Sequence, residues 1–365
     1  MTVQPIRVLI VDDSAVIRRQ LSGVLGSDPE ITVAGIAGNG SLALARISEL
    51  KPDVITLDVE MPGMSGIETL VEIRKLYPRL PVIMFSSLTG PGAAATVEAL
   101  ARGASDYAAK ANVSAPEPAS EQIRQELIPK IKALCAVRGA QHVPVPAPVL
   151  CRPVPFIAAP ARQPARVDVL AIGTSTGGPN ALADLMPQFP RDFPVPIVIV
   201  QHMPRMFTKL LSVRLDTLGA LRVEEGEDGR KLEPGQVWVA PGDYHMTVSR
   251  KGKDCVLGLN QDPPENSCRP AVDVLFRSAA QAFGANVLGV VLTGMGSDGK
   301  RGSAEIRNAG GTVIAQDQSS SVVWGMPGSV VNASLADRVC PLNGIVPEIL
   351  RRVLYQRGVA VGARG

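Results

Sequence analysis

Short apolar runs alternate with helical patterns along the first 138 residues of the chain. After the run IRVLIV, apolar residues at positions 16, 17, 21, 24 and 25 recur at the spacing of one helix face. Further short apolar runs follow with helical patterns between them: ITVAGI, DVITL, PVIMF and DYAA. Strands that alternate with helices build a parallel sheet covered on both faces. The pattern predicts a doubly wound α/β domain over residues 1–138.

The segment from residue 139 to residue 166 breaks this pattern because it is rich in proline. Its prolines lie at positions 144, 146, 148, 153, 155, 160 and 164. Each proline removes a backbone donor and pushes its predecessor into extended geometry, so neither a helix nor a central strand is expected. We interpret the segment as a linker, and a proline-rich docking ligand is the alternative.

The second half repeats the alternation and adds an insertion. The runs VDVLAI, VPIVIV, VLGVVLT and TVIAQ predict buried parallel strands. Shorter alternating runs between residues 221 and 259, which include VWVA, HMTVSR and DCVLGL, predict antiparallel hairpins. We expect a second doubly wound α/β domain over residues 167–357, with a mainly parallel sheet and a small antiparallel annex, followed by a tail over 358–365.

Composition narrows the class of protein. A chain of 365 residues that is 45% hydrophobic and 19% charged can form two domains with their own cores. The net charge of +3, without a basic run, gives no reason to expect nucleic acid or an anionic membrane as a partner. The N-terminal apolar run ends in two aspartates and is no signal peptide, and no apolar stretch approaches the ~20 residues of a membrane span. We expect a soluble cytoplasmic protein.

The five cysteines are widely spaced and include no CxxC pair. They lie at Cys135, Cys151, Cys255, Cys268 and Cys340. An odd number with this spacing argues against a disulfide framework and against a zinc site, and it indicates a reducing compartment.

Three carboxylates follow strands of the first domain. Asp12 and Asp13 end the first predicted strand, and Asp58 ends the third. These strand ends meet at one sheet edge, and crowded carboxylate oxygens suit Mg²⁺. The simpler interpretation makes Asp13 a cap of the helix near Ser14 and Asp58 a turn residue. Because Lys110 follows the fifth strand at the same edge, we favour the metal site.

The motifs VDDS, LDVEMPGMSG and GASDYAAK resemble those of response-regulator receiver domains. The resemblance implies a flavodoxin-like (βα)5 fold in which Asp58 accepts a phosphoryl group from a sensor histidine kinase. It also implies two sets of residues: Asp12, Asp13 and Asp58 for Mg²⁺, and Ser86, Tyr107 and Lys110 for the switch. Mg²⁺ and Lys110 would offset the charge on the transferred group.

Two positions depart from the receiver pattern. Ala111 follows the lysine where receivers usually have proline, often after a cis bond. A cis bond without proline costs ~3 kcal/mol, so we expect a trans bond or an altered loop. Pro129 interrupts the periodic run of the last helix, which we expect to be kinked or to start late.

The stretch AIGTSTGGPN follows the first strand of the second domain and matches the pattern G-x-S-x-G. It fits neither GxGxxG nor the GxxxxGK[ST] phosphate loop. Glycines on either side of Ser175 would permit the sharp strand-to-helix turn of a nucleophile elbow. A tight turn with Ser175 as an ordinary N-cap is the commoner explanation of this pattern alone, so its partners decide.

A nucleophilic serine needs a base, and the chain has three histidines. His142 lies in the linker, and His245 lies in an alternating run that places it at the surface. His202 follows the strand VPIVIVQ and ends at the sheet edge of Ser175. Asp298, in the loop after VLGVVLT, would orient the imidazole. Each residue alone could be a loop or helix-cap residue, but three strand ends that deliver Ser, His and Asp favour a triad.

The order Ser, His, Asp differs from the Ser, acid, His order of common α/β-hydrolases, so an ordinary lipase or esterase is a poor fit. Longer motifs resemble the methylesterase domain of the CheB family of chemotaxis response regulators: IGTSTGG, VIVQHM, VAPGDYHM, RPAVDVLF, VLTGMGSDG, AQD and VVWGMP. With the receiver and the linker, the resemblance covers nearly the whole chain.

This resemblance implies a protein-glutamate methylesterase and protein-glutamine glutaminase. Such an enzyme removes methyl groups from glutamyl esters on methyl-accepting chemotaxis receptors and deamidates glutaminyl side chains, without a cofactor in the esterase. By the resemblance, Ser175 is the nucleophile, His202 the general base and Asp298 its orienter. Thr176 and the Met295 backbone are candidates near the oxyanion.

Two positions depart from the CheB pattern. Thr174 replaces an alanine and could narrow the pocket, and Cys268 stands where a histidine is expected, which leaves substrate contacts there open. A switch and an enzyme on one chain predict that the unphosphorylated receiver covers the serine edge and that phosphorylation of Asp58 uncovers it. The alternative is a non-enzymatic response regulator that acts by partner binding. A DNA-binding output domain is opposed by the modest charge.

Overall fold

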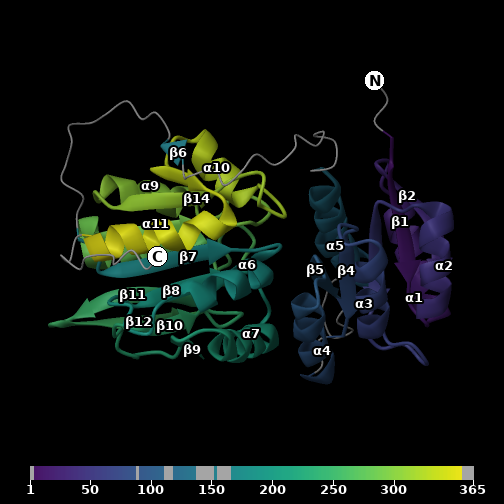
Figure 1. Cartoon of the computed structure of the whole chain (residues 1–365), viewed down its shortest axis with the longest axis horizontal. Helices are drawn as coiled ribbons and strands as arrows, with labels where there is room; N and C mark the ends of the chain where they lie inside the picture. Colours follow the sequence, from purple (N-terminus) through teal and green to yellow (C-terminus); the bar gives the residue numbers. More distant parts are fainter. Residues whose placement is uncertain (1–3, 88–89, 111–117, 137–151, 154–165, 356–365) are drawn as a thin grey trace, which may run out of the picture. The chain divides into compact units, whose positions relative to one another are not determined.

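The computed structural model of the chain describes residues 4–87, 90–110, 118–136, 152–153 and 166–355 (Figure 1). The chain divides into two units, Met1–Val143 and Pro144–Gly365. Most of the predicted linker, the predicted tail and Ala111 lie outside the described residues. None of the described helices is long and apolar enough to cross a membrane.

A five-stranded parallel sheet forms the centre of the first unit, in the order β2-β1-β3-β4-β5. Its strands are β1 (Ile6–Val11), β2 (Ile31–Ala37), β3 (Val54–Asp58), β4 (Val82–Ser86) and β5 (Asp106–Ala109). β3 and β4 are buried along their whole length because helices cover both faces of the sheet. The predicted doubly wound fold is confirmed.

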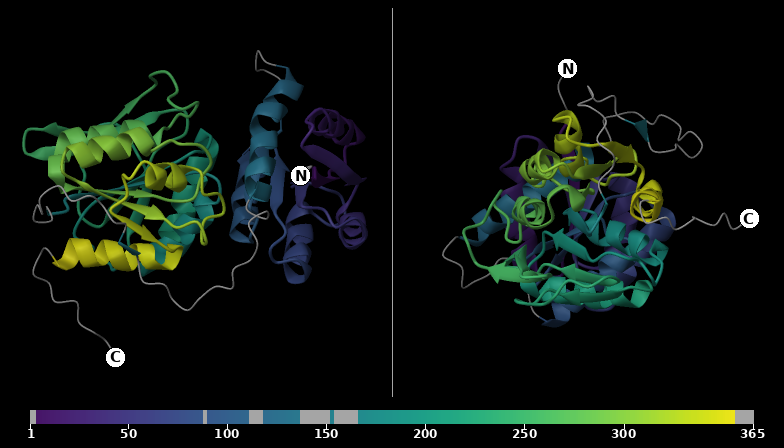
Figure 2. Two further views of the ribbon diagram at one scale, coloured as in Figure 1. Left: turned by 90° about the horizontal axis from the view of Figure 1, so that it is seen from above. Right: turned by 90° about the vertical axis from the view of Figure 1, so that its left-hand side faces the viewer.

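Five helices cover this sheet (Figure 2). α1 (Ala15–Gly26) packs beside α5 (Ala119–Ala136), and α3 (Gly66–Leu76) packs between α2 (Gly40–Leu50) and α4 (Gly90–Ala101). α5 begins ten residues before Pro129 and continues through it, so the helix does not start late. Buried apolar residues on both sides of the proline hold the helix on the unit's core: Ile123, Leu127, Ile131 and Leu134.

An eight-stranded sheet forms the centre of the second unit, in the order β6-β15-β14-β13-β7-β8-β10-β9. Its buried centre consists of β7 (Val169–Thr174), β8 (Ile197–Gln201), β13 (Val287–Val291) and β14 (Thr312–Gln316). Around it lie β9 (Arg222–Glu225), β10 (Gln236–Val239), β15 (Arg338–Cys340) and the short β6 (Arg152–Pro153). β6 is antiparallel to β15, and the other described pairs in this sheet are parallel.

The run VWVA belongs to this parallel sheet, so its prediction as part of a hairpin is wrong. β10 pairs in parallel with β8 and with β9. Three successive residues of β10 are buried, as in a strand covered on both faces, and a run this short does not reveal its partner. The hairpin prediction is confirmed for β11 (His245–Lys251) and β12 (Asp254–Asn260), which form a separate antiparallel pair.

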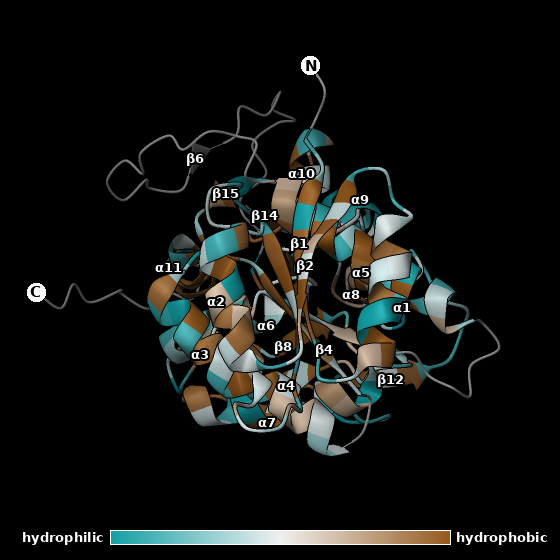
Figure 3. Ribbon diagram, turned by 90° about the vertical axis from the view of Figure 1, so that its right-hand side faces the viewer, coloured by the Kyte–Doolittle hydropathy of each residue, from teal (hydrophilic) through white to brown (hydrophobic). Residues whose placement is uncertain are grey.

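Two helix layers enclose the second sheet. α8 (Val272–Phe283) packs on α9 (Lys300–Asn308), which contacts α10 (Met326–Asn332). α6 (Gly178–Leu185) contacts both α7 (Arg205–Leu218) and α11 (Leu342–Tyr355), and the short 3-10 helices η2 (Met186–Gln188) and η3 (Gly284–Asn286) precede β8 and β13. Figure 3 shows hydrophobic residues along the inner strands and hydrophilic residues on outward turns of the helices. Because β7 pairs in parallel with both β8 and β13, the carboxyl ends of these three strands meet at one edge of the sheet.

Cys340, the last residue of β15, is disulfide-bonded, which corrects the expectation from cysteine spacing. The antiparallel pairing of β6 with β15 places Arg152 opposite Val339, next to Cys340 in the chain. Spacing along the chain gave no sign of this pairing, because the two strands are far apart in the sequence. Cys135, Cys255 and Cys268 are free thiols.

Candidate active site and phosphorylation site

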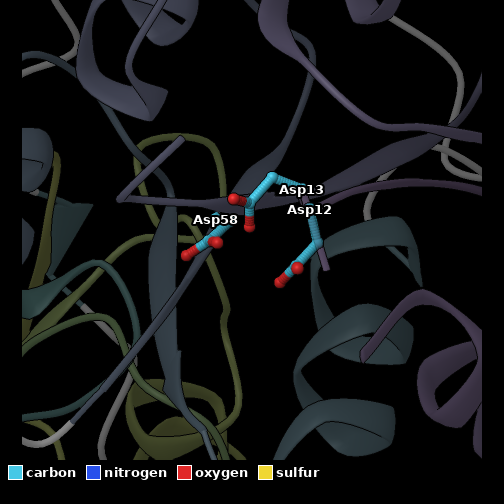
Figure 4. A group of neighbouring side chains, drawn as sticks. All are labelled: Asp12, Asp13 and Asp58. Carbon is cyan, nitrogen blue, oxygen red and sulfur yellow. The ribbon is translucent and has the colours of Figure 1, made fainter. Parts of the chain in front are cut away.

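Asp12, Asp13 and Asp58 meet at the carboxyl edge of the first sheet (Figure 4). One ligand oxygen from each lies within 4.8 Å of the others. They are brought together because β1 and β3 are neighbours in the sheet. Asp13 does not cap α1: Ser14 is the N-cap, and its Oγ accepts a hydrogen bond from Ile17 N. The simpler interpretation of Asp13 as a cap is therefore wrong.

The charge of this cluster is only partly balanced. Lys110 Nζ lies 2.8 Å from Asp58 Oδ1 and 3.2 Å from Asp12 Oδ2. Burial raises the pKa of Asp58 to about 6; Lys110 counteracts this shift, and the charge of Asp12 adds to it. Asp12 Oδ2 is buried and accepts no hydrogen bond from the described residues. Three carboxylates with one lysine form an acidic cluster typical of a Mg²⁺ site.

A cavity of ≈ 640 Å³ lies over the cluster and is lined by Asp13, Asp58 and Lys110, among others. Ser86 ends β4 beside it, and its carbonyl accepts a hydrogen bond from Lys110 N (2.7 Å). The Ser86 hydroxyl donates to the carbonyl of Gly92 (3.1 Å). Sheet pairing thus brings Ser86 close to the cluster, but its hydroxyl is engaged by α4.

Tyr107 lies inside the unit and does not line this cavity. Its ring is 4% exposed and lies 4.7 Å from Lys130 Nζ. Burial, with the charges of Glu126 and Asp106, raises the pKa of Tyr107 well above 10. The side chain is held as a neutral phenol within the β5–α5 layer.

Ser175 lies one residue past β7 at the carboxyl edge of the second sheet. Its N–H donates to Thr293 O (3.0 Å), and its carbonyl accepts from Gly178 N (2.8 Å). α6 begins at Gly178 with Gly177 as its N-cap, at a left-handed φ of 79° that favours glycine. Ser175 is therefore not the helix cap, and the alternative interpretation of this motif is wrong.

The loop after β13 lies directly against the serine. A Cβ on Gly294 would lie 2.8 Å from Ser175 Cβ, so only glycine fits there. The amide of Gly178 is used within the turn, whereas the amides of Thr176 and Met295 donate no hydrogen bond to any described residue. These two amides come directly after Ser175 and Gly294, the two residues that lie against each other.

His202 and Asp298 flank the serine on its two neighbouring strands. His202 follows β8, and its N–H donates to Thr174 O (3.2 Å). Asp298 comes from the loop after β13, on the other side of β7, and its Oδ2 lies 2.7 Å from His202 Nε2. Within the described residues no hydrogen bond joins Ser175 Oγ to the imidazole. The ring nitrogen that Asp298 does not contact is Nδ1.

Asp298 also caps a helix, but not the one that follows it. Its oxygens accept from Val272 N (2.6 Å) and Asp273 N (2.9 Å), the first amides of α8. They also accept from Gly299 N (2.9 Å) and Asn266 Nδ2 (2.8 Å). α9 begins after Gly299 without a side-chain cap, so the alternative interpretation of Asp298 as the cap of the helix that follows it is wrong. The carboxylate is held in place by four donors besides His202.

This arrangement favours the charged pair. Burial disfavours the imidazolium, but the hydrogen bond with Asp298 and the contact with Cys268 outweigh it and raise the pKa of His202 above 6.5. Burial likewise opposes ionisation of Asp298, yet His202 and the α8 amides hold the pKa of this carboxyl below its usual value. The site can therefore store a proton on His202.

Comparisons with known proteins cover nearly the whole chain. The CheB methylesterase family matches residues 170–349, and the response regulator receiver domain family matches residues 8–115. A protein-glutamate methylesterase/protein-glutamine glutaminase of Trichodesmium erythraeum is 49% identical over 350 residues, which cover 95% of this chain and 99% of that protein. The chain belongs to the CheB methylesterase family.

The similarity extends to other members of the CheB family. A protein-glutamate methylesterase/protein-glutamine glutaminase of Nocardioides sp. is 51% identical over 362 residues, with 98% of each chain covered. The crystal structure of the Thermotoga maritima CheB methylesterase catalytic domain has 43% sequence identity and a TM-score of 0.49, and the match covers 51% of this chain and 98% of that one.

The two departures from the CheB pattern occupy defined places. Thr174 is buried, and its Oγ1 donates to Thr293 O (2.9 Å), so its larger side chain fills space within the sheet edge. Cys268 Sγ lies 3.6 Å from His202 Nδ1. The cysteine therefore contacts the ring nitrogen that Asp298 leaves open.

His245 is 1% exposed, so its predicted surface position is wrong. Its Nδ1 accepts from Ala271 N (3.2 Å), and its Nε2 lies 3.2 Å from Pro263 O. Strand alternation failed because the segment that follows β12 covers the start of β11. His245 is a structural residue of the CheB esterase unit.

Two polar residues of this site were missed by sequence reasoning. Gln201 Nε2 donates to the carbonyls of Ser175 (3.0 Å) and His202 (3.3 Å). Asn266 Nδ2 donates to Asp298 Oδ1 (2.8 Å) and Asp273 Oδ2 (2.9 Å). The only signal for Asn266 was its place beside Cys268 in NSCRP, since Asn-Ser favours a turn.

Proposed function

We propose that this chain hydrolyses glutamyl methyl esters on methyl-accepting chemotaxis receptors, releases methanol, and deamidates receptor glutamines to glutamate. Both activities appear in the names of its relatives. The observation that carries the proposal is the 2.7 Å contact of His202 with Asp298 at strand ends that flank Ser175. Ser175 is the nucleophile, His202 the general base and Asp298 the group that orients it.

The reaction follows acyl transfer through a serine ester. The Ser175 oxygen attacks the glutamyl carbonyl carbon while His202 takes the hydroxyl proton at Nδ1. The amides of Thr176 and Met295 donate to the tetrahedral oxyanion. The bond to the methoxy oxygen then breaks, His202 returns the proton, and methanol leaves. Water hydrolyses the remaining ester by the same steps, and with a glutaminyl substrate ammonia leaves instead.

Asp298 supports these reaction steps by its charge as well as by its position. The imidazolium that forms during attack lies against a carboxylate held by four other donors. That carboxylate cannot rotate away without breaking hydrogen bonds to α8. The raised pKa of His202 lowers the cost of proton uptake and raises the pH needed to keep the base neutral.

In the receiver, we propose that Asp58 accepts a phosphoryl group from a sensor histidine kinase. The acidic cluster fits Mg²⁺ held by Asp12, Asp13 and Asp58, and so does the buried Asp12 Oδ2, which accepts no hydrogen bond from the described residues. The metal, when bound, neutralises charge on the phosphoryl oxygens. Lys110 contacts Asp58 directly, and it forms the proposed switch with Ser86 and Tyr107.

We propose that phosphorylation regulates the esterase by controlling access to Ser175. The protein is proposed to work in the cytoplasm, where the kinase and the receptor tails are available. The unphosphorylated receiver covers the edge that carries Ser175, and phosphorylation of Asp58 weakens this docking. Deletion of residues 1–138 is expected to raise basal esterase activity. A truncated protein with an unaltered rate would exclude masking.

Methanol release from methylated receptor fragments, with and without acetyl phosphate, tests the esterase. Ser175→Ala should abolish release and retain receptor binding, whereas Ser249→Ala, the same change at an exposed position of β11, should match the wild type. Turnover by Ser175→Ala would remove the assignment. A serine-directed phosphonate should label Ser175; absence of both label and turnover would favour the non-enzymatic alternative.

A further inference from the structure

A four-residue turn, Glu265–Cys268, approaches the acid and the base of the proposed triad. Glu265 N donates to Cys268 O (3.1 Å), and Cys268 N donates to Glu265 O (3.0 Å). Asn266 and Ser267 both have left-handed backbones, with φ of 54° and 61°. Two successive left-handed residues are typical of a tight hairpin turn with asparagine first and glycine second. Serine in the second position is strained, and such strain is common at functional sites.

Asn266 links two buried carboxylates through one amide group. Its Nδ2 donates to Asp298 Oδ1 (2.8 Å) and to Asp273 Oδ2 (2.9 Å). Asp273 Oδ1 is held in turn by Gly302 N (2.7 Å). Burial, together with the charge of Asp298, raises the pKa of Asp273. The two N–H groups of one amide therefore fix the separation of two carboxylates that repel each other.

Cys268, two residues later, contacts the base. Its Sγ lies 3.6 Å from His202 Nδ1, while Nε2 of the same ring is occupied by Asp298. The thiol therefore lies at the nitrogen that must accept the serine proton. The groups that face this pair are Asp298 and Cys268 at the imidazole, with Asp273 beside Asp298. Glu265 lies within electrostatic range of Asp298, and Arg301 lies within electrostatic range of Glu265.

Both ends of the turn are anchored by arginines. Arg277 of α8 forms an ion pair with Glu265 (2.7 Å). Arg269 forms one with Asp243 (2.6 Å) and donates to Gln261 O (3.0 Å). Because each end is tied to a different part of the unit, the turn can hold its two side chains at fixed places.

We propose that the Glu265–Cys268 turn positions the acid–base pair of the esterase. Asn266 fixes the rotation of Asp298, and Cys268 holds the His202 ring at Nδ1 until Ser175 takes that place with substrate bound. Both are positioning residues, since they act through Asp298 and His202 and not on the ester. The proposal rests on the triad assigned above.

The first experiment compares Asn266→Gly with Ser267→Gly in the full-length chain. Glycine accepts the left-handed backbone at both positions, so the fold is retained. Ser267→Gly is the matched control, because the Ser267 side chain makes no hydrogen bond among the described residues. We expect kcat to fall about 10- to 100-fold for Asn266→Gly with KM nearly unchanged, because the base is misplaced. Equal kcat values for the two variants would overturn the role of Asn266.

The second experiment tests Cys268 through the pH dependence of kcat/KM. Cys268→Ala removes a contact that favours the imidazolium, so the acid limb should move to lower pH. Cys268→Ser keeps a small hydrogen-bonding group at Nδ1, and we expect an acid limb between those of Cys268→Ala and the wild type. An NMR titration of the His202 ring should show the same order. An acid limb and a ring titration unchanged in Cys268→Ala would overturn the role of Cys268.

Ser175→Ala and His202→Ala, assayed beside these variants, distinguish a failure of the turn proposal from a failure of the triad assignment. If both are inactive while Asn266→Gly and Cys268→Ala behave as wild type, the turn has no positioning role and the triad stands. If Ser175→Ala or His202→Ala retains turnover, the triad itself is wrong.

Discussion

Both units place carboxylates at the carboxyl edge of a parallel sheet, but the two sets of carboxylates differ in how many donors surround them. In the receiver, Asp12, Asp13 and Asp58 share Lys110, and Asp12 Oδ2 accepts no hydrogen bond from the described residues. In the esterase, Asp298 accepts from His202, three backbone amides and Asn266. The first site has too few positive partners for its charge. The second has a donor at almost every lone pair.

With the functions proposed above, this difference explains how one architecture can serve two kinds of chemistry. An under-compensated cluster attracts a cation and with it a phosphoryl group, so its carboxylates must stay accessible. A fully hydrogen-bonded carboxylate attracts no metal and acts by holding an imidazole in one orientation. The position at the strand ends is shared, and the number of donors around the carboxylate decides its role.

The largest effect is expected from Asp298→Asn, measured as kcat for methanol release. An amide of the same shape cannot stabilise the imidazolium and favours the wrong ring tautomer, so kcat should fall about 10³- to 10⁴-fold. Asp254→Asn makes the same change on the exposed hairpin and should leave kcat within about twofold of the wild type. A loss of less than about tenfold in Asp298→Asn would show that the carboxylate does not orient the base.

Stability should respond to the same substitution with opposite signs in the two units. Asp298→Asn removes charged hydrogen bonds and should lower the free energy of unfolding by about 1–3 kcal/mol. Burial disfavours the charge of Asp58 and raises the pKa of this carboxyl to about 6. Asp58→Asn removes that charge and should raise the free energy of unfolding of the receiver by about 1 kcal/mol. Both tryptophans lie in the esterase unit, so fluorescence follows that unit and circular dichroism follows both. Shifts of equal sign would contradict the comparison.

Mg²⁺ should stabilise only the under-compensated site. At roughly ten times its Kd the metal should add about 1.4 kcal/mol to receiver stability, by preferential binding to the folded state. Asp12→Asn should reduce this gain, while the esterase transition seen by fluorescence should not move. Chelation with EDTA should reverse the effect. Equal stabilisation of both transitions would point to a nonspecific salt effect.

The smallest effect concerns the pH at which the esterase loses activity. The base must be neutral to accept a proton, and its raised pKa makes it charged at a higher pH than an ordinary histidine. Activity should therefore fall as the pH drops, with the midpoint of kcat/KM above 6.5. A midpoint at or below 6.5 would mean that Asp298 and Cys268 do not outweigh burial.

The sequence could predict those site residues that directly follow a strand. Ser175, His202 and Asp298 each follow a run of apolar residues, and parallel strands align such ends whatever the details of packing. Asp12 and Asp58 were found by the same reasoning. These residues are marked locally, because the strand before each of them is visible in the sequence.

What failed depended on contacts between distant segments. β10 was misassigned because a short apolar run does not show whether its neighbour runs parallel or antiparallel. The two hydrogen-bond partners of the His245 ring lie 18 and 26 positions away in the sequence, so strand alternation gave the wrong exposure. Asn266 lies in a turn and donates a hydrogen bond to Asp298, which is 32 positions away in the sequence. No spacing rule connects two such residues.

The attachment of Asp298 to α8 bears on how an inert form of this protein should be made. A variant for trapping a methylated receptor peptide must lose turnover and keep the shape of the site. Changes at Asp298 would also loosen the first turn of α8, because the amides of Val272 and Asp273 donate to this carboxylate. Substitution of Ser175 removes only the hydroxyl that is proposed to attack the ester, and it is the better choice for capturing the bound peptide.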